Sequence, residues 1–147
     1  MSLKEKLMDD LKTSMKNKDK VRKNVVTMIR SAIKQKEVDE RIELDDEGII
    51  DIISKQVKQK RDSIEDFKKG NRDDLVDLTE QEVSVLLEYL PEQLSEDEVR
   101  VMVKETIDEV GAESMKDMGK IMGRIMPKIK GKADGSLVNK IAKDYLK

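Results

Sequence analysis

The stretch Ser114–Gly135 reads SMKDMGKIMGRIMPKIKGKADG, and its spacing is the clearest guide to the fold. Basic residues recur at every fourth position and, at about 100° per residue, cover one third of a helix surface. They are Lys116, Lys120, Arg124 and Lys128. The opposite side carries isoleucines and methionines, namely Met118, Ile121, Met122, Ile125, Met126 and Ile129. The stretch therefore predicts an amphipathic helix with a basic face and an apolar face.

Two glycines and one proline affect how this predicted helix packs and where it ends. Gly119 and Gly123 lie where its two faces meet, and we expect them to allow a close helix crossing within the small domain. Close approach of a nucleic-acid backbone is the alternative. Pro127 removes a donor and crowds the carbonyl of Gly123, so a bend or an early helix end is expected there. After the turn at residues 130–135, Ser136 is the expected cap of a last helix.

The composition favours an all-α protein. Of the 147 residues, 42% are charged and 37% hydrophobic, so the apolar residues must be concentrated on helix faces. Only one Phe, two Tyr and no Trp are present. This scarcity of aromatic residues argues against a β-sandwich core and against a platform on which bases stack.

The absence of His and Cys excludes several kinds of chemistry. No disulfide, Cys or His metal site, thiolate nucleophile or imidazole base can form. No acidic cluster has the spacing of a calcium loop, so we expect no metal and no cofactor. No apolar run reaches transmembrane length and no signal-peptide pattern begins the chain. The expectation is a soluble cytoplasmic protein without a membrane partner.

Apolar stripes upstream of this stretch predict four helices within residues 1–90, and the stripes after residue 94 predict three more. Leu90–Leu94 contains Pro91 and forms the expected joint. The predicted architecture is all-α, with a four-helix bundle-like domain over residues 1–93 and a small three-helix domain over residues 94–147.

Local signals place several helix ends. Asp45 or Asp46 is the expected cap of the third helix. Gly70 is the expected left-handed residue at its end, and Asp73 the cap of the fourth. Ser95–Glu98 has the form of a capping box and predicts the start of the fifth helix.

Charge is unevenly distributed although the formal net charge is only −2. Lys and Arg are in excess over residues 1–38 and 111–147, whereas Asp and Glu are in excess over residues 39–110. Such a chain can bind a polyanion through its ends, or its ends can fold onto its own acidic middle. The sequence leaves both alternatives open.

Five segments of the chain resemble the YqeY-like proteins. These are Leu7–Lys20, the pair Lys60–Ile64 and Asn71–Leu75, the motif YLPEQL at Tyr89–Leu94, and DMGK at Asp117–Lys120 continuing to Gly135. The resemblance covers essentially the whole chain. The C-terminal third also resembles the tail domain of the B subunit of the aspartyl/glutamyl-tRNA amidotransferase.

This resemblance implies an N-terminal helical domain followed by a small tail-like domain. In the amidotransferase the tail contributes to tRNA recognition, and the matching positions here are Gly131, Lys132, Ala133, Val138 and Asn139. Pro127 departs from the tail pattern, and the residues of the B subunit's catalytic cradle are absent. The resemblance therefore implies a similar fold for this chain, but it does not imply the catalytic activity of the amidotransferase.

Three functions remain open from the sequence. The leading expectation is a non-catalytic accessory protein that binds tRNA or another structured RNA. Its candidate RNA-binding residues are Lys116, Lys120, Arg124, Lys128, Lys130, Gly131, Lys132, Gly135, Asn139 and Lys140. The first alternative is an adaptor whose Met and Gly surface holds a protein partner. The second is a carbon–nitrogen ligase with glutamine as amido donor, which rests on family likeness alone and for which no residue is a convincing catalyst.

Overall fold

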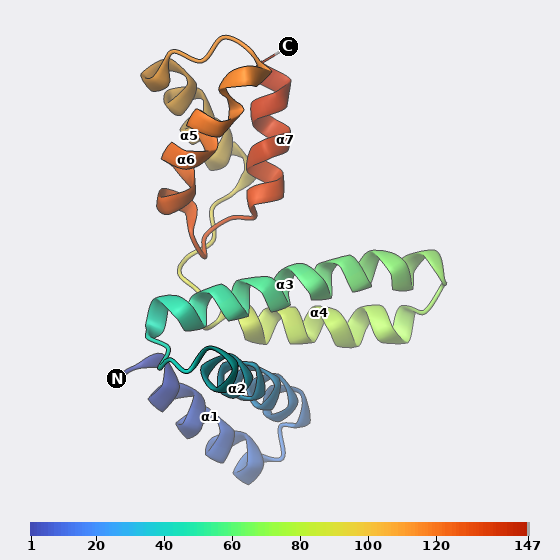
Figure 1. The fold of residues 1–147 in the computed structure, drawn as a ribbon. Coiled ribbons are helices and arrows are strands. Elements are labelled where there is room, and N and C mark those ends of the chain that lie inside the picture. The colour runs from blue at the N-terminus through green and yellow to red at the C-terminus, as the bar shows by residue number, and fades with distance from the viewer. Residues whose placement is uncertain (147) are drawn as a thin grey trace. The chain divides into compact units, whose positions relative to one another are not determined.

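The computed structural model describes residues 1–146, and the regular structure of this range is entirely helical (Figure 1). The elements are α1 (Leu3–Asn17), α2 (Lys20–Glu40), α3 (Asp46–Lys69), α4 (Asp73–Leu87), α5 (Glu96–Val110), the 3₁₀ turn η1 (Met115–Asp117), α6 (Met118–Ile129) and α7 (Gly135–Tyr145). The all-α prediction is confirmed. Within the same range, no helix combines the length and apolar composition that crossing a membrane requires.

The chain divides between Leu90 and Pro91 into two compact units. The first unit contains α1 to α4, and the second contains α5, η1, α6 and α7. Gln93 belongs to the second unit, because its side-chain amide donates to the Gly131 carbonyl at 2.6 Å. The backbone N–H of Leu94 likewise donates to the Lys132 carbonyl at 2.9 Å.

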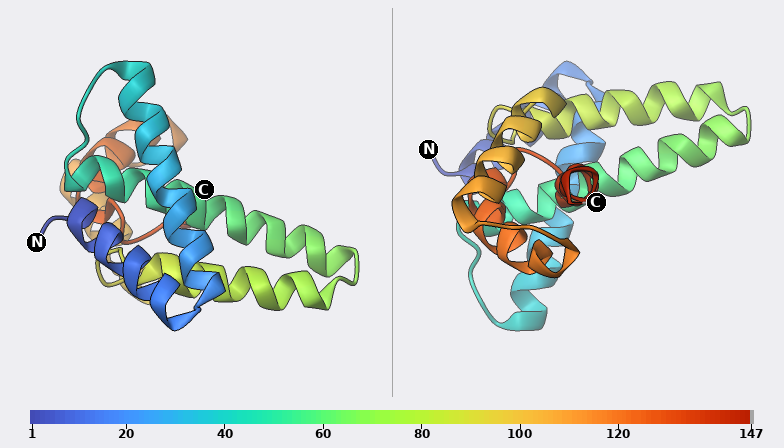
Figure 2. Two further views of the ribbon diagram at one scale, coloured as in Figure 1. Left: turned by 90° about the horizontal axis from the view of Figure 1, so that it is seen from below. Right: turned by 90° about the horizontal axis from the view of Figure 1, so that it is seen from above.

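The first unit consists of two helical hairpins that cross. α1 pairs with α2 and α3 pairs with α4, and α2 packs against both helices of the second hairpin. Figure 2 shows the hairpins crossing rather than running side by side. Their contact buries a core whose fully enclosed members include Leu7, Val26, Ile29, Ile49, Ile53 and Leu86.

The second unit packs α5, α6 and α7 around a smaller core of Val99, Val103, Ile121, Ile125, Ile129, Val138, Ile141, Ala142 and Leu146. The predicted capping box is present at its start. The Ser95 hydroxyl accepts from the Glu98 N–H at 3.1 Å, and the Glu98 carboxylate accepts from the Ser95 N–H at 3.2 Å. Gly111 ends α5 in the left-handed region at φ 67°.

Helix ends in the first unit agree with expectation only in part. Asp45 caps α3 as predicted, accepting from the Gly48 N–H at 2.9 Å. Gly70, however, has φ −88°, and Asn71 is the left-handed residue at φ 56°. Asn tolerates this conformation because its short polar side chain can bond locally. Asp73 is already inside α4, which follows Arg72 without a side-chain cap.

The prediction for the α6 segment needs three corrections. Lys116 lies on η1, because the 3₁₀ turn precedes α6. α6 continues through Pro127 to Ile129 rather than stopping early. The proline removes one hydrogen bond, to the carbonyl of Gly123, which is on the exposed side of the helix. The cap of α7 is Asp134, whose carboxylate accepts from the Ser136 N–H at 2.9 Å.

Candidate functional site

The basic side chains of α6 face solvent because its isoleucines face the core. Ile121, Ile125 and Ile129 are completely buried. Lys120, Arg124 and Lys128, which alternate with them along the helix, are exposed. This arrangement agrees with the amphipathic pattern of the sequence. It places three of the ten candidate RNA-binding residues on one helix surface.

The middle of this surface is partly neutralised. The Arg124 guanidinium makes an ion pair with the Glu109 carboxylate of α5. This hydrogen bond, followed by charge attraction, lowers the pKa of Glu109 and raises that of Arg124. The Lys120 ammonium lies 3.8 Å from the Asp117 carboxylate. Both cations are therefore less available to an external anion than the sequence pattern implies.

The cations without an ion pair lie toward the ends of the segment. Lys132 in the turn after α6 and Lys140 on α7 are exposed, and neither pairs with a carboxylate among residues 1–146. Lys128 at the end of α6 is exposed and makes no ion pair in this range, although its charge helps to lower the pKa of the Glu109 carboxylate. Lys116 on η1 is likewise exposed and makes no ion pair among residues 1–146. Lys130 is also exposed in this turn. The α6–α7 turn is therefore the most cationic part of the candidate surface.

The backbone of the α6–α7 turn is held in place by the start of the second unit. Gly131 adopts φ 74°, which favours glycine, and its carbonyl accepts from the Gln93 amide. The Lys132 carbonyl accepts from the Leu94 N–H. These bonds fix both carbonyls inward, so the turn presents its lysine side chains on a defined backbone.

The N-terminus of α7 is a poorer phosphate site than its glycines suggest. The Asp134 carboxylate occupies the helix end, and the N–H groups of Lys132 and Ala133 donate to the Ile129 carbonyl. Gly135 lies against Met126, whose Cε is 3.4 Å from the position of an added Cβ. Asn139 is half-buried. Lysine side chains, rather than backbone N–H groups, are the available anion ligands here.

The expected close helix crossing at the α6 glycines is wrong. An added Cβ at Gly119 or at Gly123 would meet nothing within 4 Å. The neighbouring helices pack on the isoleucine side instead. Met118 and Met122 are partly buried against the core, but Met126 is 40% exposed. α6 therefore presents an open strip of glycine and methionine beside its basic side chains.

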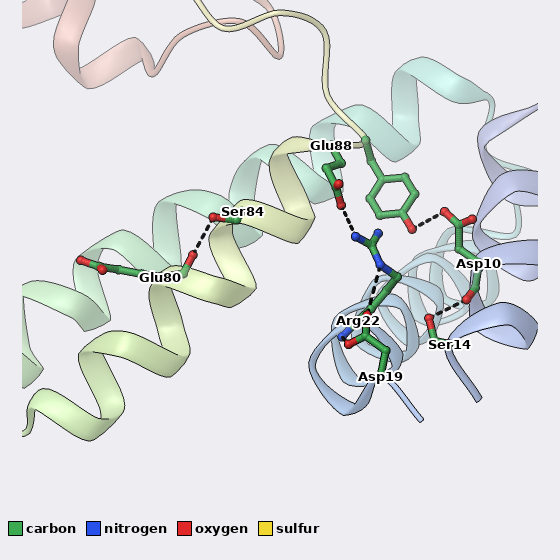
Figure 3. Close-up of polar contacts among 8 residues, drawn as sticks. Asp10, Ser14, Asp19, Arg22, Glu80, Ser84 and Glu88 are labelled. Atoms are coloured by element: carbon green, nitrogen blue, oxygen red, sulfur yellow. Dashed lines mark hydrogen bonds and ion pairs between the residues drawn. The ribbon is translucent and has the colours of Figure 1, made fainter. Parts of the chain in front are cut away.

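A polar cluster around the buried Tyr89 of the first unit was not anticipated from the sequence (Figure 3). Tyr89, 4% exposed, donates its hydroxyl proton to the Asp10 carboxylate at 2.5 Å. Beside it, Arg22 donates to Glu88 at 2.5 Å and lies 3.7 Å from Asp19. Burial, and then the hydrogen bond to Asp10, raise the pKa of Tyr89. The partners are 79 and 66 residues apart in sequence, so no local pattern could reveal the cluster.

The described residues hold no group of three or more His, Cys, Asp or Glu side chains that could bind a metal ion.

Curated relatives share part of this sequence. The three described here are each named "Altered inheritance of mitochondria protein 41, mitochondrial". The relative from Lachancea thermotolerans is 42% identical over 85 residues, which are 57% of this chain and 46% of its own length. Those from Candida glabrata and Saccharomyces cerevisiae strain YJM789 are 39% and 36% identical, over 58% and 57% of this chain and 48% and 46% of their own lengths. The matches thus span about half the length of these relatives.

The relatives correct one expectation from the sequence. The chain was expected to be cytoplasmic, but the relatives that match it at 36–42% identity are named mitochondrial proteins. Their names point to mitochondria rather than to the cytoplasm. The expectation rested on the lack of a recognisable targeting pattern, which is weaker evidence than the names of similar proteins.

The family assignment rests on a longer match than that to any of these relatives. Residues 4–146 match the family described as "Yqey-like protein". The match includes both units and the whole α6–α7 segment. The chain therefore belongs to the YqeY-like protein family.

Proposed function

We propose that the protein is a non-catalytic accessory protein that binds a structured RNA, with tRNA as the foremost candidate, through the α6–α7 surface. The observation that carries the proposal is a set of exposed lysines that make no ion pair among the described residues. Lys128 and Lys132 flank the turn, and Lys140 follows on α7. The resemblance of this segment to an amidotransferase tail domain adds support.

Charge and shape favour a folded RNA over a splayed single strand. The second unit contains a single aromatic residue, Tyr145, so it lacks the rings on which successive bases stack. Lysines on a fixed turn suit the phosphates of a helical RNA, where recognition depends on shape and backbone. Because Arg124 and Lys120 already have acidic neighbours, the turn lysines supply most of the binding energy in this proposal.

The test is a titration of labelled tRNA against the full-length protein at several salt concentrations. We expect Lys128→Glu/Lys132→Glu to weaken binding strongly and to reduce the salt dependence. Each lost phosphate contact lowers the slope of log K against log salt by about 0.7–0.9. Two lost contacts therefore remove roughly 1.4–1.8 from this slope.

A matched control places the same charge change on the first unit. Lys68 and Lys69 are exposed at the end of α3, and Lys68→Glu/Lys69→Glu should leave tRNA affinity nearly unchanged. Circular dichroism of both variants verifies that they remain helical. Equal affinity of the wild type and the Lys128/Lys132 variant, or binding without salt dependence, would rule out the proposed RNA surface.

A second candidate function is a protein adaptor that uses the open strip of α6. The observation in its favour is the empty space over Gly119 and Gly123 beside the exposed Met126. A partner helix could approach closely there and contact the flexible thioether. Gly123→Ala separates the two functions, because an added methyl group should block this helix and leave tRNA binding through the lysines intact.

A further inference from the structure

A groove runs between α1 and α2 on the first unit, far in sequence from the candidate RNA-binding residues. It encloses 520 Å³. The buried side chains of Leu7 and Ile33 form its floor. None of its lining residues belongs to the Tyr89 cluster. The groove is therefore a separate surface feature.

The two walls of the groove differ in chemistry. α1 contributes Met8 and Leu11, and Met8 is 38% exposed although it is apolar. α2 contributes Thr27, Arg30 and Lys34, which are spaced i, i+3 and i+7 and so lie on one face of the helix. One side of the groove is thus apolar and the other is cationic.

The cations of this wall lack acidic partners. Neither Arg30 nor Lys34 makes an ion pair with a carboxylate among the described residues, and Arg30 is half-buried. Some other cations of the first unit are paired, as in Arg22 with Glu88 and Lys60 with Glu82. At one end of the groove, Lys4 is paired with Glu37 at 2.5 Å. Among the cations that line this groove, the unpaired positive charge therefore lies along the α2 wall.

The length of the groove matches a short helix. Its α2 wall extends from Thr27 to Glu37, which is about 15 Å at 1.5 Å per residue. An incoming helix of about three turns covers the same distance. The apolar α1 wall suits a helix better than it suits RNA, because a nucleic-acid backbone gains little from contact with Met8 and Leu11.

We propose that the α1–α2 groove binds an acidic amphipathic helix of a partner protein. The apolar stripe of that helix packs between Met8 and Leu11, and its acidic flank lies along Arg30 and Lys34. Charge complementarity decides the occupant, because carboxylates would give both cations the partners they lack within the described chain. The protein would then bind a protein helix through its first unit and RNA through its second.

The probe is a fluorescein-labelled synthetic peptide of about 18 residues, long enough to form a helix on binding. It carries Leu at i, i+3, i+4 and i+7 and Glu along one flank. A second peptide has the same composition in scrambled order. Fluorescence anisotropy with the full-length protein should show binding of the patterned peptide and much weaker binding of the scrambled one.

Substitutions in the groove identify the surface. Arg30→Glu/Lys34→Glu should lower the affinity for the patterned peptide roughly tenfold or more, because two attractive charge pairs become repulsive. Lys12→Glu/Lys16→Glu makes the same charge change on α1 outside the groove and should have little effect. Met8→Asp should also lower the affinity for the patterned peptide, because it disrupts the apolar wall. Circular dichroism verifies the fold of each variant.

Several results would overturn this proposal. Equal affinity for the patterned and scrambled peptides would mean that charge alone drives binding. Equal losses in the groove variant and in the Lys12/Lys16 variant would place the peptide elsewhere. If Arg30→Glu/Lys34→Glu abolished tRNA binding and left the peptide unaffected, the groove would be a nucleic-acid site instead.

Discussion

At the scale of single residues, the Tyr89 cluster ties three helices of the first unit together. Asp10 comes from α1 and Arg22 from α2, and Tyr89 follows the end of α4 (Figure 3). Lys6 lies over the Tyr89 ring, with its ammonium 5.3 Å from the ring centre. The cluster therefore fixes the last residues of the first unit just before the division at Pro91.

We predict that Tyr89→Phe destabilises the first unit by about 1–2 kcal/mol, because the Asp10 carboxylate loses a buried donor. Urea unfolding of the full chain, followed by circular dichroism, measures the change. Tyr145→Phe is the matched control: Tyr145 is 46% exposed on α7, and its loss of a hydroxyl should cost less than about 0.5 kcal/mol. An equal effect of the two substitutions would contradict the role assigned to the cluster.

The Lys4–Glu37 pair gives a pH dependence with a defined sign. The hydrogen bond from Lys4, and then the N–H of Leu44, lower the pKa of Glu37 from its ordinary value of 4.5. A lowered pKa stabilises the fold above the ordinary value, and this contribution is lost as the pH falls through the folded-state pKa. The Lys4–Glu37 pair therefore contributes to the stability of the fold at neutral pH, and this contribution is lost in acid.

We predict that Glu37→Gln lowers the melting temperature at neutral pH and that this difference disappears in acid. Thermal melts between about pH 6 and pH 3 test the prediction. Glu40→Gln is the control, since Glu40 is exposed on the same helix without an ion pair among residues 1–146. Parallel pH profiles for the wild type and Glu37→Gln would show that the pair contributes nothing.

At the scale of elements, α5 determines how much charge α6 displays. α5 carries six acidic and two basic residues, and its Glu109 reaches Arg124 on the neighbouring helix. An isolated α6 would appear strongly basic. Within the unit, Arg124 and Lys120 lie beside carboxylates, whereas Lys128 at the helix end makes no ion pair among residues 1–146 and acts on Glu109 only through its charge. The functional surface is therefore shifted toward the α6–α7 turn.

The glycines of α6 and α5 should respond in opposite ways to alanine. Gly123 lies inside α6, and an added Cβ there would meet nothing within 4 Å. Gly123→Ala should therefore raise the free energy of unfolding by about 0.5–1 kcal/mol. Gly111 has φ 67°, so Gly111→Ala should destabilise by about 1–2 kcal/mol. Urea titrations compare both variants with the wild type. A loss of stability in Gly123→Ala would mean that another element packs on this face of α6.

At the scale of the whole molecule, the two units have cores of different size. Within residues 1–146, sixteen buried hydrophobic residues form the first core and nine form the second. A smaller unit buries a smaller share of its surface and has less to offset its conformational entropy. The second unit is therefore expected to be the less stable of the two.

We predict that the full chain unfolds in two steps, with the second unit first. Hydrogen exchange at increasing denaturant should release the amides of Val103 and Ile125 before those of Ile29 and Ile53. All four residues are buried in helices, so they report on their units rather than on fraying ends. Release of all four amides in one coincident transition would show that the units unfold together.

Much of the fold is determined locally, and the sequence alone was sufficient for it. Apolar residues at helical spacing identified the seven α-helices of residues 1–146, because a helix must turn one face toward a core. Asp45 and the Ser95–Glu98 box marked helix starts, since these side chains bond to N–H groups within three residues. Gly70 was misassigned, because the adjacent Asn71 can also adopt the left-handed conformation and does so in this turn.

Tertiary structure decided which charges and which surfaces remain available. Arg124 is paired with a carboxylate 15 residues away, and Tyr89 bonds to one 79 residues away. The helical period cannot reveal such pairs, because they depend on which helix packs beside which. The exposure of Gly123 and the walls of the α1–α2 groove have the same origin. The sequence alone determined where the helices form and which faces they bury, and helix packing decided what those helices leave for a partner.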